Sequence, residues 1–274
     1  MKHIVIGASF LTSLMLLNAC TVDDHSVSDS DGLATNSITE ETHVSYTGSQ
    51  VVTIETKLRD GSNTDVNLVS GDTLKVSTVG DPSHLNFSDN LFDRLPDVAD
   101  QVKVMQQGSR RVYDQYVSGL WYYATIDAKY RDKEFTVALL RDRQNDAPNS
   151  VVTLPPEFTI SIDEMQSLAT LSRTAPMTVR WTPANPGYAM KVSVFVNCSN
   201  GTKGKWDSGS FVNQAPNPLD NYQIPTTAYA GYTGECIVTV GVENSQLNAA
   251  DASLGPGSTI QSHQYRTIAV TTME

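Results

Sequence analysis

The sequence is poor in the residues that most often perform chemistry. Its 274 residues include only three cysteines and five histidines. It contains no H-E-x-x-H, no paired C-x-x-C, no G-x-S-x-G and no P-loop motif, each of which places specific ligands or nucleophiles at a fixed spacing. We therefore expect no metal site, no cofactor and no catalytic centre.

Basic residues are also scarce, with 19 Lys and Arg against 30 Asp and Glu, which gives a net charge of −11. Binding to nucleic acid requires a basic patch that neutralises phosphates. The basic residues between 129 and 133 alternate with acidic ones, a pattern typical of an exposed hairpin edge, where charges discourage pairing with other strands. We expect no nucleic-acid partner.

Long hydrophobic runs are absent except near the start of the chain. Lys2 precedes an uncharged, largely apolar run of 14 residues from Ile4 to Leu17. A membrane-spanning helix needs about 20 apolar residues, so this run is too short to cross a bilayer. Its length and its basic lead-in are typical of a signal peptide, which is not part of the mature fold.

The run ends in "LNAC" at 17–20, which resembles the lipobox of bacterial lipoproteins at Leu17, Ala19 and Cys20. In that family the cysteine thiol receives a diacylglyceryl group, the chain is cut before the cysteine, and the new amine is acylated. The resemblance implies a signal peptide at 1–19 and a lipid anchor at Cys20. Thr21 stands where some family members carry Asp, which implies the outer membrane. The alternative is an ordinary secretory signal followed by an incidental cysteine.

The next segment, 20–44, contains six acidic residues, no Lys or Arg, and many Ser and Thr. Such a segment buries little apolar surface to offset the entropy lost on ordering. We expect it to be a disordered acidic tether that holds the folded part away from the membrane.

Beyond the tether, apolar residues recur mostly at every second position, which indicates half-buried β-strands separated by turns. The runs that show this spacing include 120–126, 135–139, 158–162 and 177–181. Many short strands without long helical periodicity predict a sandwich or barrel. We expect an all-β fold of two immunoglobulin-like β-sandwich domains.

Prolines and polar residues at 144–158 mark the predicted boundary between the domains. Domain one would span 45–146 and domain two 147–274. Within domain one, Val98, Val102 and Met105 have helical spacing, so a helical insertion near 81–108 is expected.

Domain two resembles fibronectin type III and related immunoglobulin-like domains in "PMTVRWTPANPGYAMKVSVFVNC" (176–198) and "TTAYAGYTGECIVTVGVEN" (226–244). The resemblance implies that Trp181 points into the core. It also implies that Tyr229 or Tyr232 pins a corner through its hydroxyl.

Cys198 and Cys236 share the parity of the valines before and after them, so both thiols face the core. An exported protein folds in an oxidising compartment, and these are the two cysteines left once Cys20 is lipidated. We expect a disulfide between them; the alternative is two buried free thiols.

Four histidines follow the signal peptide. His25 and His43 lie in or beside the expected tether, and His84 and His263 lie in different predicted domains. With no partner fixed by a motif, each is predicted to be a surface or structural residue.

Aromatic residues provide the remaining candidate sites. "LWYYATI" at 120–126 would place Trp121 and Tyr123 on the face opposite to the apolar positions, and Trp206 follows a Gly-rich turn. Exposed aromatic side chains suggest contact with a partner, whereas covered ones belong to the core. The three residues are candidates for partner binding, with core packing as the alternative.

These patterns favour a lipid-anchored protein of the cell envelope that acts as a non-catalytic binding or structural module. Its partner would be another envelope protein or a glycan, and the membrane would hold it through Cys20. The alternative is an envelope hydrolase with a site at the domain junction, because isolated histidines and carboxylates can converge there. An immunoglobulin-like fold is compatible with both roles, so the fold alone does not show which of them applies.

Overall fold

The computed structural model describes residues 27–79, 90–91, 93–94, 120–166, 171–214 and 218–273. Cys20, His25 and His84 lie outside these ranges, as does most of the predicted helical insertion. Where that insertion is described, it forms two short strands, β6 (Asn90–Leu91) and β7 (Asp93–Arg94).

Among the described residues the helices are 3₁₀ turns of three or four residues, so the fold is all-β, as predicted. The turns are η1 (Ser30–Gly32), η2 (Thr35–Ser37), η4 (Ala128–Tyr130), η5 (Asp163–Gln166) and η6 (Thr226–Ala228). No helix in the described part of the chain has the length and hydropathy needed to cross a membrane.

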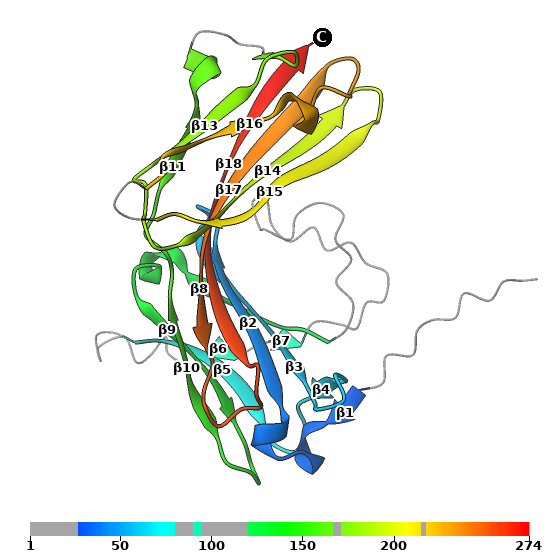
Figure 1. Ribbon diagram of the computed structural model, residues 1–274. Coiled ribbons are helices and arrows are strands. Elements are labelled where there is room, and N and C mark those ends of the chain that lie inside the picture. The colour runs from blue at the N-terminus through cyan, green and yellow to red at the C-terminus, as the bar shows by residue number, and fades with distance from the viewer. Residues whose placement is uncertain are drawn as a thin grey trace, which may run out of the picture.

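One long sheet runs through the whole molecule, and a smaller sheet faces each of its ends (Figure 1). We call the two ends the first and second lobes. The strands of the first lobe are β1 (Val27–Asp29), β2 (Thr39–Tyr46), β3 (Val51–Arg59), β4 (Asp65–Asn67), β5 (Thr73–Val79), β6, β7, β8 (Tyr122–Asp127), β9 (Glu134–Leu140) and β10 (Ala147–Thr153). Those of the second lobe are β11 (Thr159–Ile162), β12 (Leu171–Ser172), β13 (Met177–Thr182), β14 (Ala189–Cys198), β15 (Lys203–Val212) and β16 (Asn221–Ile224).

The C-terminal hairpin joins the lobes. Its strands β17 (Cys236–Ala249) and β18 (Thr259–Met273) are the longest of the described strands. β17 pairs with β14 in the second lobe, while β18 pairs in parallel with β2 in the first lobe. The long sheet therefore has the order β1-β4-β3-β2-β18-β17-β14-β15, faced by β10-β9-β5-β6 at one end and β11-β13-β16 at the other.

Each lobe has its own apolar core, built by the alternation that the sequence shows. Phe135, Val137 and Leu139 face the first core together with Tyr122 and Ile126. The second core contains Trp181 and the valines of β14 and β17. The strand parities predicted from the sequence are confirmed in both lobes.

The predicted boundary between residues 146 and 147 is wrong, because the cores divide the chain elsewhere. β10 pairs with β9, and its Ala147 and Val152 lie in the first core. Leu254 and Ile260, from the C-terminal hairpin, also lie in the first core. The chain crosses from one lobe to the other after Leu154 and returns through the hairpin, so a single boundary in sequence cannot separate the lobes.

The prediction of a disordered tether is wrong for residues 27–44. β1 pairs with β4, Ile38 is fully buried, and β2 lies between β3 and β18 in the long sheet. The prediction from composition failed because several polar groups of this segment have hydrogen-bond partners far away in the sequence. Residues 20–26 of the predicted tether lie outside the described residues.

Arg141 holds the first turns of this segment, at residues 30–35. Its side chain is fully buried and pairs with Asp72, with an Nε–Oδ2 distance of 2.7 Å. Its Nη2 donates to the carbonyl oxygens of Ser30 and Leu33 at 2.6 and 3.0 Å, and Nη1 donates to Thr35. One guanidinium therefore satisfies two backbone carbonyls and one hydroxyl of residues 30–35 and one buried carboxylate.

The second core has the buried tryptophan expected from the immunoglobulin-like resemblance, but it differs in two contacts. Trp181 is 1% exposed. Tyr229 is fully buried, and its hydroxyl donates to Ala175 O at 2.5 Å across 54 positions of sequence, whereas the corner tyrosine of immunoglobulin-like domains bonds to backbone a few residues upstream. Cys198 and Cys236 form a disulfide, as predicted. The two cysteines are register partners on β14 and β17, so the bond joins neighbouring strands of one sheet, whereas antibody domains bridge two sheets.

Glu40 is a buried acid inside the first lobe. It is 1% exposed, and its carboxyl oxygens accept from Thr42 at 2.6 Å and from Ser150 at 3.0 Å. Burial raises the pKa of Glu40 to about 7, with a further contribution from nearby Asp251. The native state therefore binds a proton at Glu40 more tightly than the unfolded chain does.

Replacing Arg141 by Met should destabilise the protein by about 3–5 kcal/mol, because the change leaves the Asp72 carboxylate buried without its cation. Urea unfolding monitored by circular dichroism measures the loss. Arg143→Met is the matched control, since the Arg143 side chain is 71% exposed; its effect should stay within about 0.5 kcal/mol. Equal effects of the two substitutions would contradict this role for Arg141.

Glu40 should make the protein less stable as the pH rises. Its folded pKa of about 7 exceeds the ordinary value of 4.5, so its favourable contribution is present below pH 4.5 and is lost through pH 7. The full difference amounts to about 3 kcal/mol. Glu40→Gln should remove this part of the pH dependence when unfolding is compared at pH 5 and pH 8.5. The half-buried Glu134, changed to Gln, should leave the dependence intact; a Glu40→Gln profile equal to wild type would refute the assignment.

Candidate functional site

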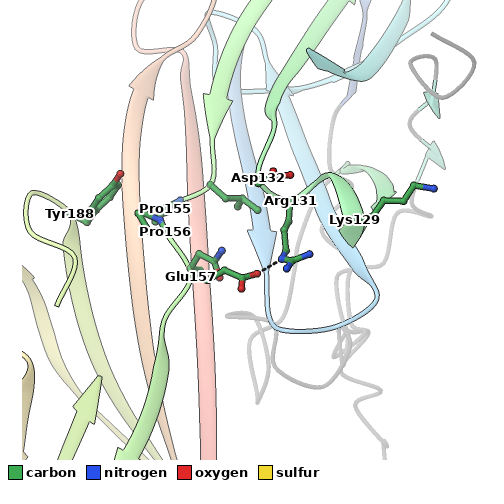
Figure 2. Close-up of a pocket in the computed structure, with 9 residues that line it drawn as sticks. Lys129, Arg131, Asp132, Pro155, Pro156, Glu157 and Tyr188 are labelled. Carbon is green, nitrogen blue, oxygen red and sulfur yellow. Dashed lines mark hydrogen bonds and ion pairs between the residues drawn. The ribbon is translucent and has the colours of Figure 1, made fainter. Parts of the chain in front are cut away.

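The junction of the lobes contains a cleft of about 500 Å³ (Figure 2). η4 and the two residues after it form one side, and the chain crossing between lobes forms another. β18 and the residue preceding β14 complete the wall. The lining residues are Lys129, Arg131, Asp132, Leu154, Pro155, Pro156, Glu157, Tyr188 and Gln264.

Charge pairs and cation–π contacts hold this junction together. Arg131 forms an ion pair with Glu157 across the cleft (Figure 2). Behind it, the ring of Tyr46 lies 5.1 Å from the guanidinium of Arg266 and 5.9 Å from that of Arg131. Arg266 also lies 5.6 Å from the ring of Phe158 in the second lobe. Such contacts strengthen when they are desolvated, and burial here lowers the pKa of Arg266.

A polar layer lies on the inner face of the hairpin between the two apolar cores. We define it as Asn244, Ser262 and Gln264, which are at most 1% exposed. On the same face, Val242 of β17 belongs to the second core and Ile260 of β18 to the first. Asn244 and Gln264 are register partners. Gln264 also lines the cleft, so the polar layer meets the cleft at this residue.

The opposite face of the same sheet carries two buried histidines from distant parts of the chain. Nδ1 of His43 on β2 lies 3.4 Å from Nε2 of His263 on β18. Each ring also contacts a carboxylate: His43 Nε2 lies 3.0 Å from Glu41, and His263 Nδ1 lies 2.5 Å from Glu243. The His43 contact, together with Arg59, lowers the pKa of Glu41 to about 2.

The assignment of His43 to a disordered tether is wrong, because His43 lies on an ordered strand that pairs directly with β18. This pairing brings His43 and His263 together. A parallel pairing between residues 220 positions apart leaves no motif in the sequence. The parity of Glu41 and His43 on one strand is the only local signal that could have indicated a shared face.

This arrangement differs from that of a hydrolytic triad. In a serine hydrolase one histidine nitrogen faces a carboxylate and the other faces the nucleophilic hydroxyl. Here the second nitrogen of each ring faces the other imidazole. The contacts join β2, β17 and β18, so a structural role in closing the long sheet accounts for them.

The aromatic candidates differ in exposure. Trp121 is 8% exposed, with its ring 6.4 Å from that of His43 and 5.5 Å from Nζ of Lys57. Tyr123 is half-buried, and burial raises its pKa. Trp206 is also half-buried; its ring lies 6.2 Å from that of Tyr222 and packs against the second core. That these three residues bind a partner stays a prediction. Trp121 has little exposed surface for such a contact.

Within the described ranges, no group of three or more His, Cys, Asp or Glu side chains is arranged to hold a metal ion. The sequence offered no signal for the junction cleft, because its lining residues come from four separate segments.

Comparison with known proteins adds no relative to this picture: no family model matches the chain, and no curated protein matches it significantly.

Glu243→Gln should destabilise the protein by about 1.5–3 kcal/mol, because the charged acceptor of the fully buried His263 is lost. Guanidinium unfolding at pH 7 measures the change. Glu235→Gln is the control, since Glu235 is exposed just before β17 begins, and its stability should match wild type. If both variants unfold like wild type, the histidine pair does not help to close the sheet.

Proposed function

We propose that the chain is a lipid-anchored protein of the cell envelope, held at Cys20, whose two lobes form a non-catalytic binding module. The observation that carries the proposal is the position of β1. It begins at Val27, seven residues after Cys20. It lies at the end of the first lobe that points away from the second lobe (Figure 1).

This position gives the anchored protein a direction. Seven extended residues reach about 24 Å at most, so the first lobe would stand close to the bilayer. The second lobe and the junction would then face away from the membrane, toward partners in the envelope. Two or more acyl chains at one cysteine hold a protein stably on a membrane, and the outer membrane is the location that the residues after Cys20 favour.

Binding is favoured over catalysis by the character of the junction. The described residues that line the cleft include carboxylates, cationic groups, a tyrosine and an amide, but no histidine. The paired histidines lie on the other face of β18. A rigid cleft with a few polar groups and an aromatic wall is typical of ligand recognition. Its partner would be a glycan or another envelope protein.

The anchor predicts how the protein partitions in detergent. Wild-type protein from cells should enter the detergent-rich phase, because acyl chains at Cys20 carry it there. Cys20→Ala should leave the protein unprocessed or in the aqueous phase. Cys198→Ser is the matched control and should still partition with detergent, because the sulfur of Cys198 belongs to a disulfide in the second lobe and carries no lipid. Wild-type protein found in the aqueous phase would overturn the anchor.

The binding role has its own test. Crosslinking in intact cells, followed by purification of the anchored chain, should capture a defined envelope component. A chain that captures nothing while remaining anchored would contradict the binding role and leave the anchor standing.

A further inference from the structure

The side-chain amide of Gln264 contains an acceptor that the protein does not satisfy. Gln264 is 1% exposed, and its Oε1 has no hydrogen-bond partner among the described residues. The neighbouring Asn244 amide and Ser262 hydroxyl share this condition. An unsatisfied buried polar group costs about 1–3 kcal/mol, so most buried polar groups in native proteins have a partner. Of these three side chains, Gln264 is the one that also lines the junction cleft, so a ligand in the cleft can supply its missing partner.

The position of Gln264 indicates where that partner binds. Gln264 lines the junction cleft, and it is the member of the polar layer that does so. The cleft volume of about 500 Å³ lies within the range of small-ligand sites, which is about 300–1,000 Å³. This volume is several times that of a single water, which occupies about 30 Å³ in the liquid.

The walls of the cleft define the chemistry of the ligand. Tyr188, Pro155 and Pro156 provide flat apolar surfaces on one side (Figure 2). Lys129 and Arg131 are balanced by Asp132 and Glu157, and Arg131 is already paired with Glu157. A balanced wall favours neither an anion nor a cation. The ligand needs a donor for Gln264, several further hydroxyl-like groups for the charged rim, and a flat face for Tyr188.

We propose that the junction cleft binds a neutral oligosaccharide, with the Gln264 side chain turning its Oε1 into the cleft to accept from one hydroxyl and one sugar face lying against Tyr188. Sugar hydroxyls both donate and accept, so they suit the carboxylates and the cationic groups of the rim together. Sugar rings present C–H faces that pack on aromatic rings. The inference rests on the proposed binding role and assigns its ligand class.

Calorimetric titration of the purified full chain in detergent tests the inference. The probes are three neutral trisaccharides, chitotriose, cellotriose and maltotriose, with triglycine and trialanine as peptide probes. At least one trisaccharide should bind, and the peptides should not. Gln264→Leu and Tyr188→Ala should each weaken that binding tenfold or more, whereas Tyr188→Phe should retain it.

Two further measurements separate a lost contact from a lost fold. Gln264→Leu should melt at or above the wild-type temperature, because an apolar side chain replaces an unsatisfied amide. Tyr222→Ala, which removes an aromatic ring that packs against the second core from β16, should leave sugar affinity unchanged. An equal loss in Tyr222→Ala would show that the effect is not local to the cleft.

The inference fails if no trisaccharide binds at millimolar concentration, if the peptides bind instead, or if Gln264→Leu and Tyr188→Ala both bind like wild type. In the first case ordered water completes the polar layer. These outcomes are independent of the crosslinking result: a captured protein partner without sugar binding would refute the oligosaccharide and preserve the binding role.

Discussion

The architecture depends on one constraint: two neighbouring strands, β17 and β18, must serve two cores at once. Their inner face is apolar where it meets the second core, polar at Asn244 and Gln264, and apolar again at Ile260. Each lobe completes its sandwich with a small sheet of its own, but neither has a complete long sheet without the hairpin. The lobes therefore share backbone hydrogen bonds, which fix their relative position more firmly than side-chain contacts across a flexible linker.

The sequence predicted much of the strand content because alternation is a local property. Val192 to Cys198 and Cys236 to Val242 show their buried parity in any window of a few residues, and both runs lie in the second core as expected. The inward Trp181 was predictable for a similar reason, because it belongs to a short pattern with a known structural role.

The failures concern polar residues whose burial is decided by distant partners. Glu40, Thr42 and His43 make their segment look disordered in composition, yet Ser150, Thr56 and His263 satisfy them across more than ten positions of sequence. Arg141 orders the turns at 30–35 in the same way. The cleft could not be predicted from the sequence for a related reason, because its charged residues come from separate segments and follow no periodic pattern. A single sequence shows which residues alternate, but it does not show which carboxylates and amides meet.

The parallel pairing of β2 with β18 has a consequence for the order in which the chain folds. β2 is one of the first strands to be synthesised and β18 is the last, so their contacts close a loop of more than 200 residues. Contacts of such high sequence separation form late, because the entropy of loop closure opposes them until other contacts have shortened the effective loop. During synthesis, β2 would emerge early and wait with one edge unpaired until β18 arrives. The partly synthesised chain, with this edge of β2 exposed, is then more vulnerable to aggregation or to capture by a chaperone than the folded protein is.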